Sequence, residues 1–117
     1  MTEAKLDLLK GTLDLLVLQI LSSMGRLHGY GLARRLEQIS GDALAMNEGT
    51  IYTSLVRLQQ RRLIRTAWGT SENNRRAKFY SLTRAGEKAL AAEAATWTRL
   101  ASVIGRVLAS SGGGAGQ

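Results

Sequence analysis

The chain has 117 residues, 44% of them hydrophobic and 21% charged, which suits one folded domain and leaves no room for a second core. Its formal net charge of +7 favours a polyanionic partner, nucleic acid ahead of an anionic membrane. Because there is no Cys and a single His, we exclude disulfides, thiolate nucleophiles and Cys- or His-rich zinc sites, and we expect neither a metal nor a cofactor. No apolar run reaches the roughly 18 residues of a membrane span, and the first residues lack the pattern of a signal peptide, so we expect a cytoplasmic protein.

The first segment, residues 5–24, has the spacing of an amphipathic helix. Thr12 can cap a new start inside it, with Asp14 near the positive end of the helix, and Gly25 is expected to end it. Its apolar side chains recur every three or four residues, at Leu6, Leu9, Leu13, Leu16 and Ile20.

A second helix is predicted over residues 30–40 and is expected to end at Gly41. We expect Tyr30 in the core at its start. His28 has no carboxylate or nucleophile near it in the sequence, so a turn-capping role fits it better than that of a ligand or general base. The apolar side of this helix is predicted to consist of Leu32, Leu36 and Ile39.

A third helix is predicted over residues 48–60, capped by Asn47 or Thr50. Its buried seam follows the spacing i, i+4, i+7 and consists of Ile51, Leu55 and Leu58. The opposite face is predicted to carry short hydrogen-bonding groups near the start and cations near the end, namely Thr50, Thr53, Ser54, Arg57 and Arg61.

The periodicity then changes to that of strands. Residues 63–68 and 77–82 are short runs rich in aromatic and β-branched residues, and the polar segment 69–75 separates them. This pattern predicts a β-hairpin with a long polar tip. We expect Trp68 to anchor the hairpin against the helices.

A last helix is predicted from the cap Thr83 to about residue 108. A helix this long on so small a domain needs a partner surface. Its apolar residues follow a heptad spacing, at Leu90, Ala94, Trp97, Ala101, Ile104 and Leu108. We therefore divide the chain into a helix-and-hairpin domain, 1–83, a C-terminal helix, 84–109, and a disordered Gly/Ser tail, 110–117.

The positive charge is concentrated in one part of the chain. From Arg57 to Arg84 there are eight basic residues and one acidic residue, Glu72, a surplus equal to the net charge of the whole chain. Three helices followed by a hairpin are the order of a winged helix-turn-helix, a mainly α fold with a small β-hairpin. This order places the charge on the third helix and the wing. We therefore predict a nucleic-acid-binding domain and no enzyme, because no catalytic constellation remains.

Each of these two elements has an expected role on DNA. The start of the third helix faces base edges, where short hydrogen-bonding side chains fit, and the cations further along follow the phosphates. The hairpin tip combines Asn and Arg, which suits phosphates and the minor groove. The DNA-binding residues predicted on these grounds are Thr50, Tyr52, Thr53, Ser54, Arg57, Arg61, Asn73, Asn74, Arg75, Arg76 and Lys78.

Four stretches resemble one known family when taken together. They are residues 8–18 (LLKGTLDLLVL), 27–32 (LHGYGL), 49–58 (GTIYTSLVRL) and 80–86 (YSLTRAG). Their order and spacing are similar to those of the PadR family of bacterial transcriptional regulators, over residues 6–108. The resemblance implies a winged helix-turn-helix, a homodimer held by the last helix of one subunit against the first helix of the other, and usually repression.

The short, single C-terminal helix is similar to that of the smaller branch of this family. The family commonly has Pro where this chain has Thr53, and Gly where it has Arg62, which makes the turn into the hairpin more basic and puts a Gly-type left-handed turn there in doubt. The dimer interface predicted on this resemblance consists of Leu6, Leu9, Leu13, Leu90, Ala94, Trp97, Ala101, Ile104 and Leu108.

Trp97 has two interpretations, because it lies centrally on the heptad spacing. It either packs in the dimer interface or forms a planar wall for a small aromatic effector between the subunits. The sequence thus predicts a homodimeric repressor that reads a pseudo-palindrome in double-stranded DNA, at the bacterial nucleoid. Two alternatives stay open: a protein-interaction module whose last helix binds another chain, and an RNA-binding winged helix, which the 5% aromatic content disfavours.

Overall fold

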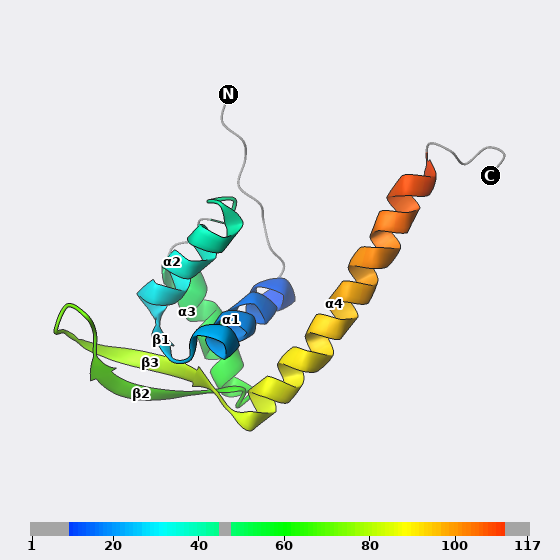
Figure 1. The fold of residues 1–117 in the computed structure, drawn as a ribbon. Coiled ribbons are helices and arrows are strands. Elements are labelled where there is room, and N and C mark those ends of the chain that lie inside the picture. The colour runs from blue at the N-terminus through cyan, green and yellow to red at the C-terminus, as the bar shows by residue number, and fades with distance from the viewer. Residues whose placement is uncertain (1–9, 45–47, 112–117) are drawn as a thin grey trace.

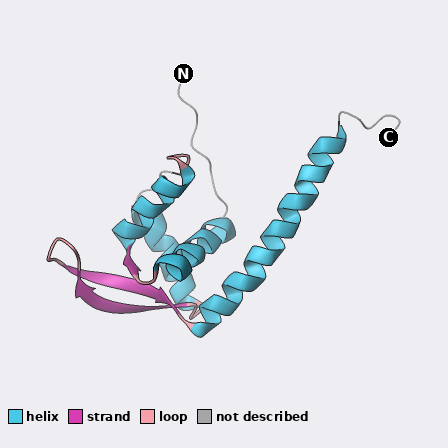
Figure 2. Cartoon of the chain, in the orientation of Figure 1, coloured by secondary structure: helices cyan, strands magenta, loops and turns pink. Residues whose placement is uncertain are grey.

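The computed structural model describes residues 10–44 and 48–111 (Figure 1). The first three helices pack together, an antiparallel sheet lies beside them, and the last helix extends away from both (Figure 2). This is the mainly helical fold with a small sheet that was predicted. In chain order the elements are α1 (Lys10–Met24), β1 (Leu27–His28), α2 (Gly29–Ser40), α3 (Glu48–Gln60), β2 (Ile64–Thr70), β3 (Arg76–Leu82) and α4 (Arg84–Ser111).

Local chemistry fixes the ends of the first two helices. Gly25 has a φ of 79° and donates its N–H to the carbonyl of Leu21 at 3.0 Å, which ends α1. Gly41, with a φ of 63°, ends α2 in the same left-handed conformation. At the start of α2, Nδ1 of His28 accepts the N–H of Gly31 at 2.9 Å. The predicted stops and the capping role of His28 are confirmed.

The hairpin is confirmed, and its central strand also pairs with a short strand that was not predicted. β3 lies between β1 and β2, with Tyr80 opposite Leu27 on one side and Thr66 on the other. β1 has two residues, too few to show a periodicity in the sequence. Directly paired residues share a face of the sheet, so one face carries Ile64, Thr66, Trp68, Lys78, Tyr80 and Leu82.

The turn from α3 into β2, which the Arg at position 62 put in doubt as a left-handed turn, is left-handed, with a φ of 61° at Arg62. The N–H of Arg62 bonds to the carbonyl of Gln59 at 2.9 Å, and that of Leu63 to the carbonyl of Leu58 at 3.0 Å. These two bonds close the end of α3 in a Schellman motif, which outweighs a cost of about 1 kcal/mol for a side chain in this conformation.

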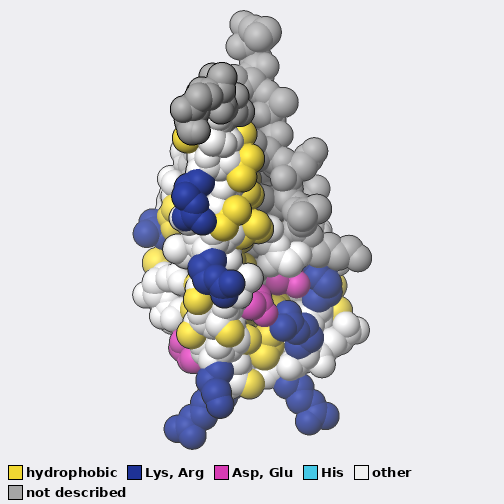
Figure 3. Space-filling model, turned by 90° about the vertical axis from the view of Figure 1, so that its right-hand side faces the viewer, with side chains coloured by type: hydrophobic (Ala, Val, Ile, Leu, Met, Phe, Trp, Pro, Cys, Tyr) yellow, Lys and Arg dark blue, Asp and Glu magenta, His cyan; other side chains and the backbone are white. Residues whose placement is uncertain are grey.

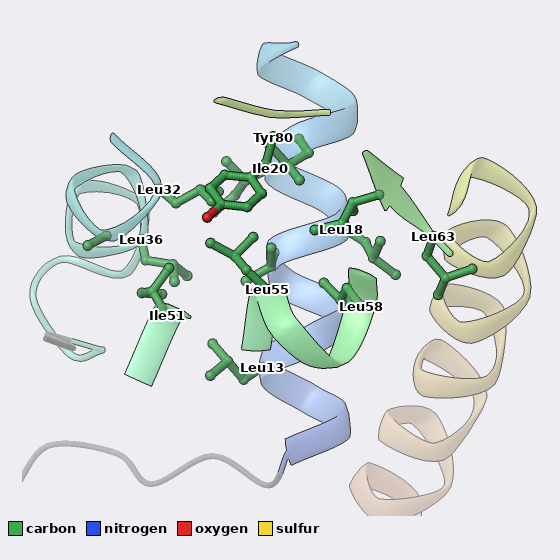
Figure 4. Close-up of a cluster of buried hydrophobic side chains, with 14 of the residues drawn as sticks. Leu13, Leu18, Ile20, Leu32, Leu36, Ile51, Leu55, Leu58, Leu63 and Tyr80 are labelled. Atoms are coloured by element: carbon green, nitrogen blue, oxygen red, sulfur yellow. The ribbon is translucent and has the colours of Figure 1, made fainter. Parts of the chain in front are cut away.

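The core lies between α1, α2, α3 and the sheet. Figure 4 shows the ring of Tyr80 between Leu32 and Leu55, and Leu63 on the side that faces α4. The side chains without measurable exposure come from three helices and are Val17, Leu18, Leu32, Ile51, Leu58 and Ser54.

Two residues predicted for the inner side of α2 are exposed instead. Tyr30 is 54% exposed and Ile39 is 62% exposed. The core contacts of this helix come from its middle turns, at Leu32, Ala33 and Leu36. The two ends of α2 therefore project beyond the core that the periodicity assigned to the whole helix.

A network at Thr83 joins the wing to α4. Its Oγ1 accepts the N–H of Gly86 at 3.0 Å, which confirms the predicted cap, and donates to the carbonyl of Arg62 at 2.9 Å. Gly86 packs so closely on the carbonyl of Leu63 that a Cβ there would collide with it. α4 runs to Ser111, so residues 110–111 are helical and the boundary expected at 109 is corrected.

Most of α4 is uncovered. Leu90 is 7% exposed, whereas no side chain from Ala91 to Ser110 is buried. Figure 3, which faces this helix, shows hydrophobic atoms along one side of it. The large apolar side chains there are 44–69% exposed and are Trp97, Leu100, Val103, Ile104, Val107 and Leu108.

Some of the predictions concern residues outside the described ranges, namely Leu6, Leu9, Asn47 and the tail 112–117.

Candidate nucleic-acid interface

α3 has one buried side and one exposed side. The exposed side starts with Tyr52 and Thr53 and continues two turns later at Gln59 and Gln60. Gln can bond an adenine edge with two hydrogen bonds. These two Gln residues were not predicted as DNA-binding, although each lies seven residues, two helical turns, after Tyr52 or Thr53.

Ser54 lies on the buried side of α3, so its predicted contact with DNA is wrong. It has no measurable exposure, and its Oγ donates to Oδ1 of Asp14 on α1 at 2.5 Å. Thr50 and Tyr52, both predicted to bind DNA, are exposed. Thr50 lies inside α3, which begins at Glu48, so it is not the cap of this helix. Thr53 is also exposed, and its hydroxyl donates to the carbonyl of Gly49 at 2.9 Å, which leaves its oxygen as an acceptor.

Arg57 is partly exposed, and its guanidinium is paired with a carboxylate of α1. Its Nη2 bonds to Oδ1 of Asp14 at 2.7 Å and its Nε to Oδ2 at 3.1 Å, so two of its three guanidinium nitrogens are engaged. The hydrogen bond to Asp14 raises the pKa of Arg57, partial burial opposes this, and the charge of Asp14 adds to the rise. A phosphate or guanine contact by Arg57 stays a prediction, and it would compete with this ion pair.

The wing presents an exposed basic tip. Ser71 donates its N–H to the carbonyl of Arg75 at 2.8 Å, and Asn74, with a φ of 58°, donates to the carbonyl of Ser71 at 2.9 Å. These bonds close a tight turn, in which Asn tolerates the left-handed conformation. The exposed residues at and beside the tip are Glu72, Asn73, Asn74, Arg75 and Arg76.

Trp68 was predicted to anchor the wing to the helices. It is 59% exposed, so this prediction is wrong. The guanidinium carbon of Arg76 lies 4.5 Å from its ring centroid, and Nζ of Lys78 lies 5.9 Å away. The two cations and the ring thus form one cluster on one face of the wing.

A concavity of about 700 Å³ separates the wing from the starts of α2 and α3. Tyr30, which the sequence analysis assigned to the core, lines it, and Nη1 of Arg34 lies 3.4 Å from the hydroxyl of Tyr30. Burial is the main cause that raises the pKa of Tyr80, and Tyr52 adds to it. The side chains that converge on this concavity include His28, Tyr30, Glu48, Tyr52, Glu72, Asn73, Arg75, Arg76, Lys78 and Tyr80.

Arg61 is exposed at the end of α3 and bonds Glu93 of α4 at 3.1 Å, with side-chain exposures of 51% and 34%. An ion pair this exposed contributes at most about 1 kcal/mol, so the guanidinium can exchange Glu93 for another anion.

Leu13 and Leu90, both assigned to the dimer interface, pack in the core of the single chain, 4% and 7% exposed. Because both are already buried within the single chain, they are not available to a partner. The other described residues of that set, Ala94, Trp97, Ala101, Ile104 and Leu108, are half-buried or exposed.

A groove of about 270 Å³ runs between α1 and α4. Trp97, 48% exposed, is part of its wall. The groove is lined by Gly11, Thr12, Leu15, Ala92, Glu93, Thr96, Trp97 and Leu100.

Two kinds of site are absent from residues 10–44 and 48–111. No cluster of three or more His, Asp or Glu side chains there could hold a metal ion. In the same residues, no helix has the length and apolar content to cross a membrane.

A three-helix body, a basic wing and a polar exposed side of α3 define a winged helix-turn-helix domain of the DNA-binding class. Residues 17–92 match the transcriptional regulator PadR-like family, and the chain belongs to this family. Its members are transcriptional regulators and not enzymes.

Solved structures agree with this assignment. The chain is 27% identical to a PadR-like transcriptional regulator from Bacillus cereus, with a TM-score of 0.73 over 85% of this chain and 93% of that one. It is 28% identical to a PadR family transcription regulator from Clostridium difficile, with a TM-score of 0.71 over 84% of this chain and 99% of that one.

A further relative is an uncharacterized 37.1 kDa protein in transposon TN4556 of Streptomyces fradiae. It is 37% identical over 74% of this chain, and the chain spans 22% of its length.

Proposed function

We propose that this chain is a homodimeric repressor that reads a pseudo-palindrome in double-stranded DNA. The observation that carries the proposal is the concavity of about 700 Å³ between the wing and the start of α3, with Tyr52, the first residue of the exposed side of α3, on one flank and the cations of the wing on the other. A duplex fits this arrangement, with α3 in the major groove and the wing on the neighbouring phosphates and minor groove. A repressor of this kind acts in the bacterial cytoplasm, at the nucleoid.

The residues divide into two roles on this proposal. Side chains on the exposed side of α3 meet base edges, and those of the wing and of the start of α2 meet phosphates. The first group consists of Thr50, Tyr52, Thr53, Gln59 and Gln60, and the second of Tyr30, Arg34, Arg61, Asn73, Asn74, Arg75, Arg76 and Lys78.

The uncovered apolar side of α4 supports a homodimer. Six large apolar side chains that are 44–69% exposed on one helix are costly in water, and the α1–α4 groove of a second copy offers an apolar surface to cover them. A two-fold axis between the copies presents two α3 helices to half-sites about 10 bp apart.

Regulation by a small molecule is the finer part of the proposal. Trp97 lines the α1–α4 groove, so a planar aromatic effector stacked on it would change how α4 of the partner is seated and thereby the angle between the two wings. Screening small aromatic compounds for release of bound DNA, with Trp97→Leu as the insensitive variant, tests this step; release that persists in Trp97→Leu would place the effector elsewhere.

Capture of genomic DNA fragments by the purified full-length protein tests the main proposal. We expect an enriched inverted repeat, and we expect Thr53→Ala together with Gln60→Ala to abolish the enrichment by removing base contacts. Gln38→Ala, an exposed change on α2, is the matched control and should retain the motif.

Three other results would reject the proposal. Uniform binding without a motif would indicate a protein that coats nucleic acid. Preferential capture by single-stranded RNA in competition would indicate an RNA-binding winged helix. The absence of any binding at low salt would leave a protein-interaction module with α4 as its binding helix.

A further inference from the structure

The buried carboxylate of Asp14 joins α1 to α3 in a region where the neighbouring core residues are apolar. Asp14 is 5% exposed on α1, in the same helix as the core residues Leu13, Val17 and Leu18. Burying a carboxylate is unfavourable unless hydrogen bonds and an opposite charge compensate it. Both compensating groups come from α3.

Asp14 accepts three hydrogen bonds from two residues that lie one turn apart on α3. Ser54 donates to Oδ1 at 2.5 Å, and Arg57 donates from Nη2 to Oδ1 at 2.7 Å and from Nε to Oδ2 at 3.1 Å. The last two bonds form a bidentate pair, the most directional contact that an Arg and a carboxylate can make. Asp14, Ser54 and Arg57 are called the Asp14 trio below.

The buried side chains of α3 other than Ser54 are apolar. The inward side of α3 consists of Ile51, Leu55 and Leu58, which pack on the leucines of α1. Apolar contacts are not directional, so on their own they allow α3 small rotations about its axis and small shifts along α1. The bidentate pair fixes both.

The trio sits directly behind the residues that would read DNA. Thr53 precedes Ser54 and Gln59 follows Arg57 by two residues in the sequence, and both lie on the exposed side of α3. A rotation of α3 that loosened the bonds to Asp14 would turn this exposed side by the same angle. A misplacement of side chains by about 1 Å is enough to break the hydrogen bonds that distinguish one base pair from another.

We propose that the Asp14 trio is a positioning device, in which Asp14 and Arg57 hold the recognition helix at the angle needed to read its operator without touching DNA themselves. This rests on the proposed function above. It assigns a role to Asp14, and it replaces the direct DNA contact expected of Arg57.

A double-variant cycle separates positioning from direct contact. The probes are the duplex most enriched in the genomic capture and a scrambled duplex of the same composition. Their binding by the full-length protein is followed by fluorescence anisotropy over a range of salt concentrations. The variants are Asp14→Asn, Arg57→Gln and both together, each shown by circular dichroism to be folded at the assay temperature.

Positioning predicts that each single variant weakens binding of the selected duplex about tenfold or more, and that the double variant is no worse than either. Binding of the scrambled duplex and its salt dependence should stay unchanged, because no phosphate contact is lost. Glu87→Gln, which removes an exposed carboxylate that accepts from Ser22 at 3.2 Å between α1 and α4, is the matched control and should bind both duplexes like the wild type.

Ser54→Ala is the milder variant if Asp14→Asn does not fold. It keeps the ion pair and removes one hydrogen bond, and we expect about a threefold loss on the selected duplex alone.

Direct contact by Arg57 predicts a different pattern, which would overturn the inference. Arg57→Gln would lower the salt dependence of binding by about one unit, and Asp14→Asn would leave binding unchanged or strengthen it by releasing the guanidinium. Equal losses on both duplexes would also overturn it. A wild-type protein that does not prefer its selected duplex refutes the proposed function before any variant is made, and the positioning role falls with it.

Discussion

The Nδ1 atom of His28 caps the start of α2. This nitrogen accepts the N–H of Gly31 at 2.9 Å, in the place where Ser or Asp more often caps a helix. Replacing His28 by Ala should lower the free energy of unfolding by about 1 kcal/mol, because one helix-terminal N–H loses its acceptor. Denaturant unfolding followed by circular dichroism measures the effect.

His28→Asn is the control for this prediction. It loses the same ring contact with Phe79 as the Ala variant but keeps a capping oxygen, so it should retain most of the stability. Equal losses in both variants would show that the ring, and not the cap, stabilises the turn.

The ring of Trp68 prepares two cations of the wing for binding. Arg76 lies 4.5 Å and Lys78 lies 5.9 Å from its centroid, and a stacked cation has lost part of its conformational freedom before DNA arrives. Trp68→Ala should therefore weaken DNA binding about two- to fivefold, measured by anisotropy. Trp68→Phe should bind nearly as the wild type does, and equal affinity of the Ala variant would separate the cluster from binding.

Residue-level predictions from the sequence succeeded where the partners are neighbours in the chain. The caps at His28 and Thr83 bond groups three residues away, so the chemistry is visible in the sequence. The positions of Ser54 and Trp68 failed, because exposure depends on packing against elements far away. The residues near Ser54 in the sequence do not indicate its hydrogen bond to Asp14, which lies 40 residues away in the chain.

Among the elements, α3 shows this division clearly. Its predicted bounds, 48–60, agree with the structure, and so does its buried seam. The rotation of the exposed side was wrong by part of a turn, because Ser54 and Arg57 look like DNA-binding side chains in isolation. Both side chains bond to the buried carboxylate of Asp14 on α1, and the polar residues that are exposed instead are Gln59 and Gln60.

α4 carries the prediction that concerns oligomeric state. Leu100→Glu with Ile104→Glu should turn the dimer into a monomer, since two buried charges without partners oppose the association. The monomer should bind the selected duplex at least about 100-fold more weakly, because the two half-sites are no longer bound together. Sedimentation equilibrium and anisotropy measure the two effects.

Thr98→Glu is the control on the same helix, since Thr98 is exposed and lies outside the apolar side of α4. A monomeric wild type, or a double variant that remains dimeric, would contradict the proposed interface.

At the scale of the whole molecule, the charge predicts how binding depends on salt. If five or six of the cations touch phosphates, the logarithm of the binding constant should fall against the logarithm of salt concentration with a slope of about −5. Arg75→Gln with Arg76→Gln should reduce the slope by about two units. Arg99→Gln on α4 should leave it unchanged, and a slope near zero would contradict phosphate binding.

The order of elements along the whole chain could be read from the sequence, and so could the concentration of charge between residues 57 and 84. The direction in which α4 extends from the three-helix body could not be predicted from the sequence. It depends on how closely Gly86 approaches the carbonyl of Leu63, a contact that no periodicity records.

That junction makes α4 a lever with a short fixed end. The helix has 28 residues, about 42 Å at 1.5 Å per residue, and its fixed part ends near Leu90. A tilt of about 10° at the pivot would move the far end by about 7 Å. In the proposed dimer, adjusting the packing beneath Gly86 would thus change the distance between the two α3 helices by about a fifth of the ~34 Å turn of DNA, without altering any residue that touches a base.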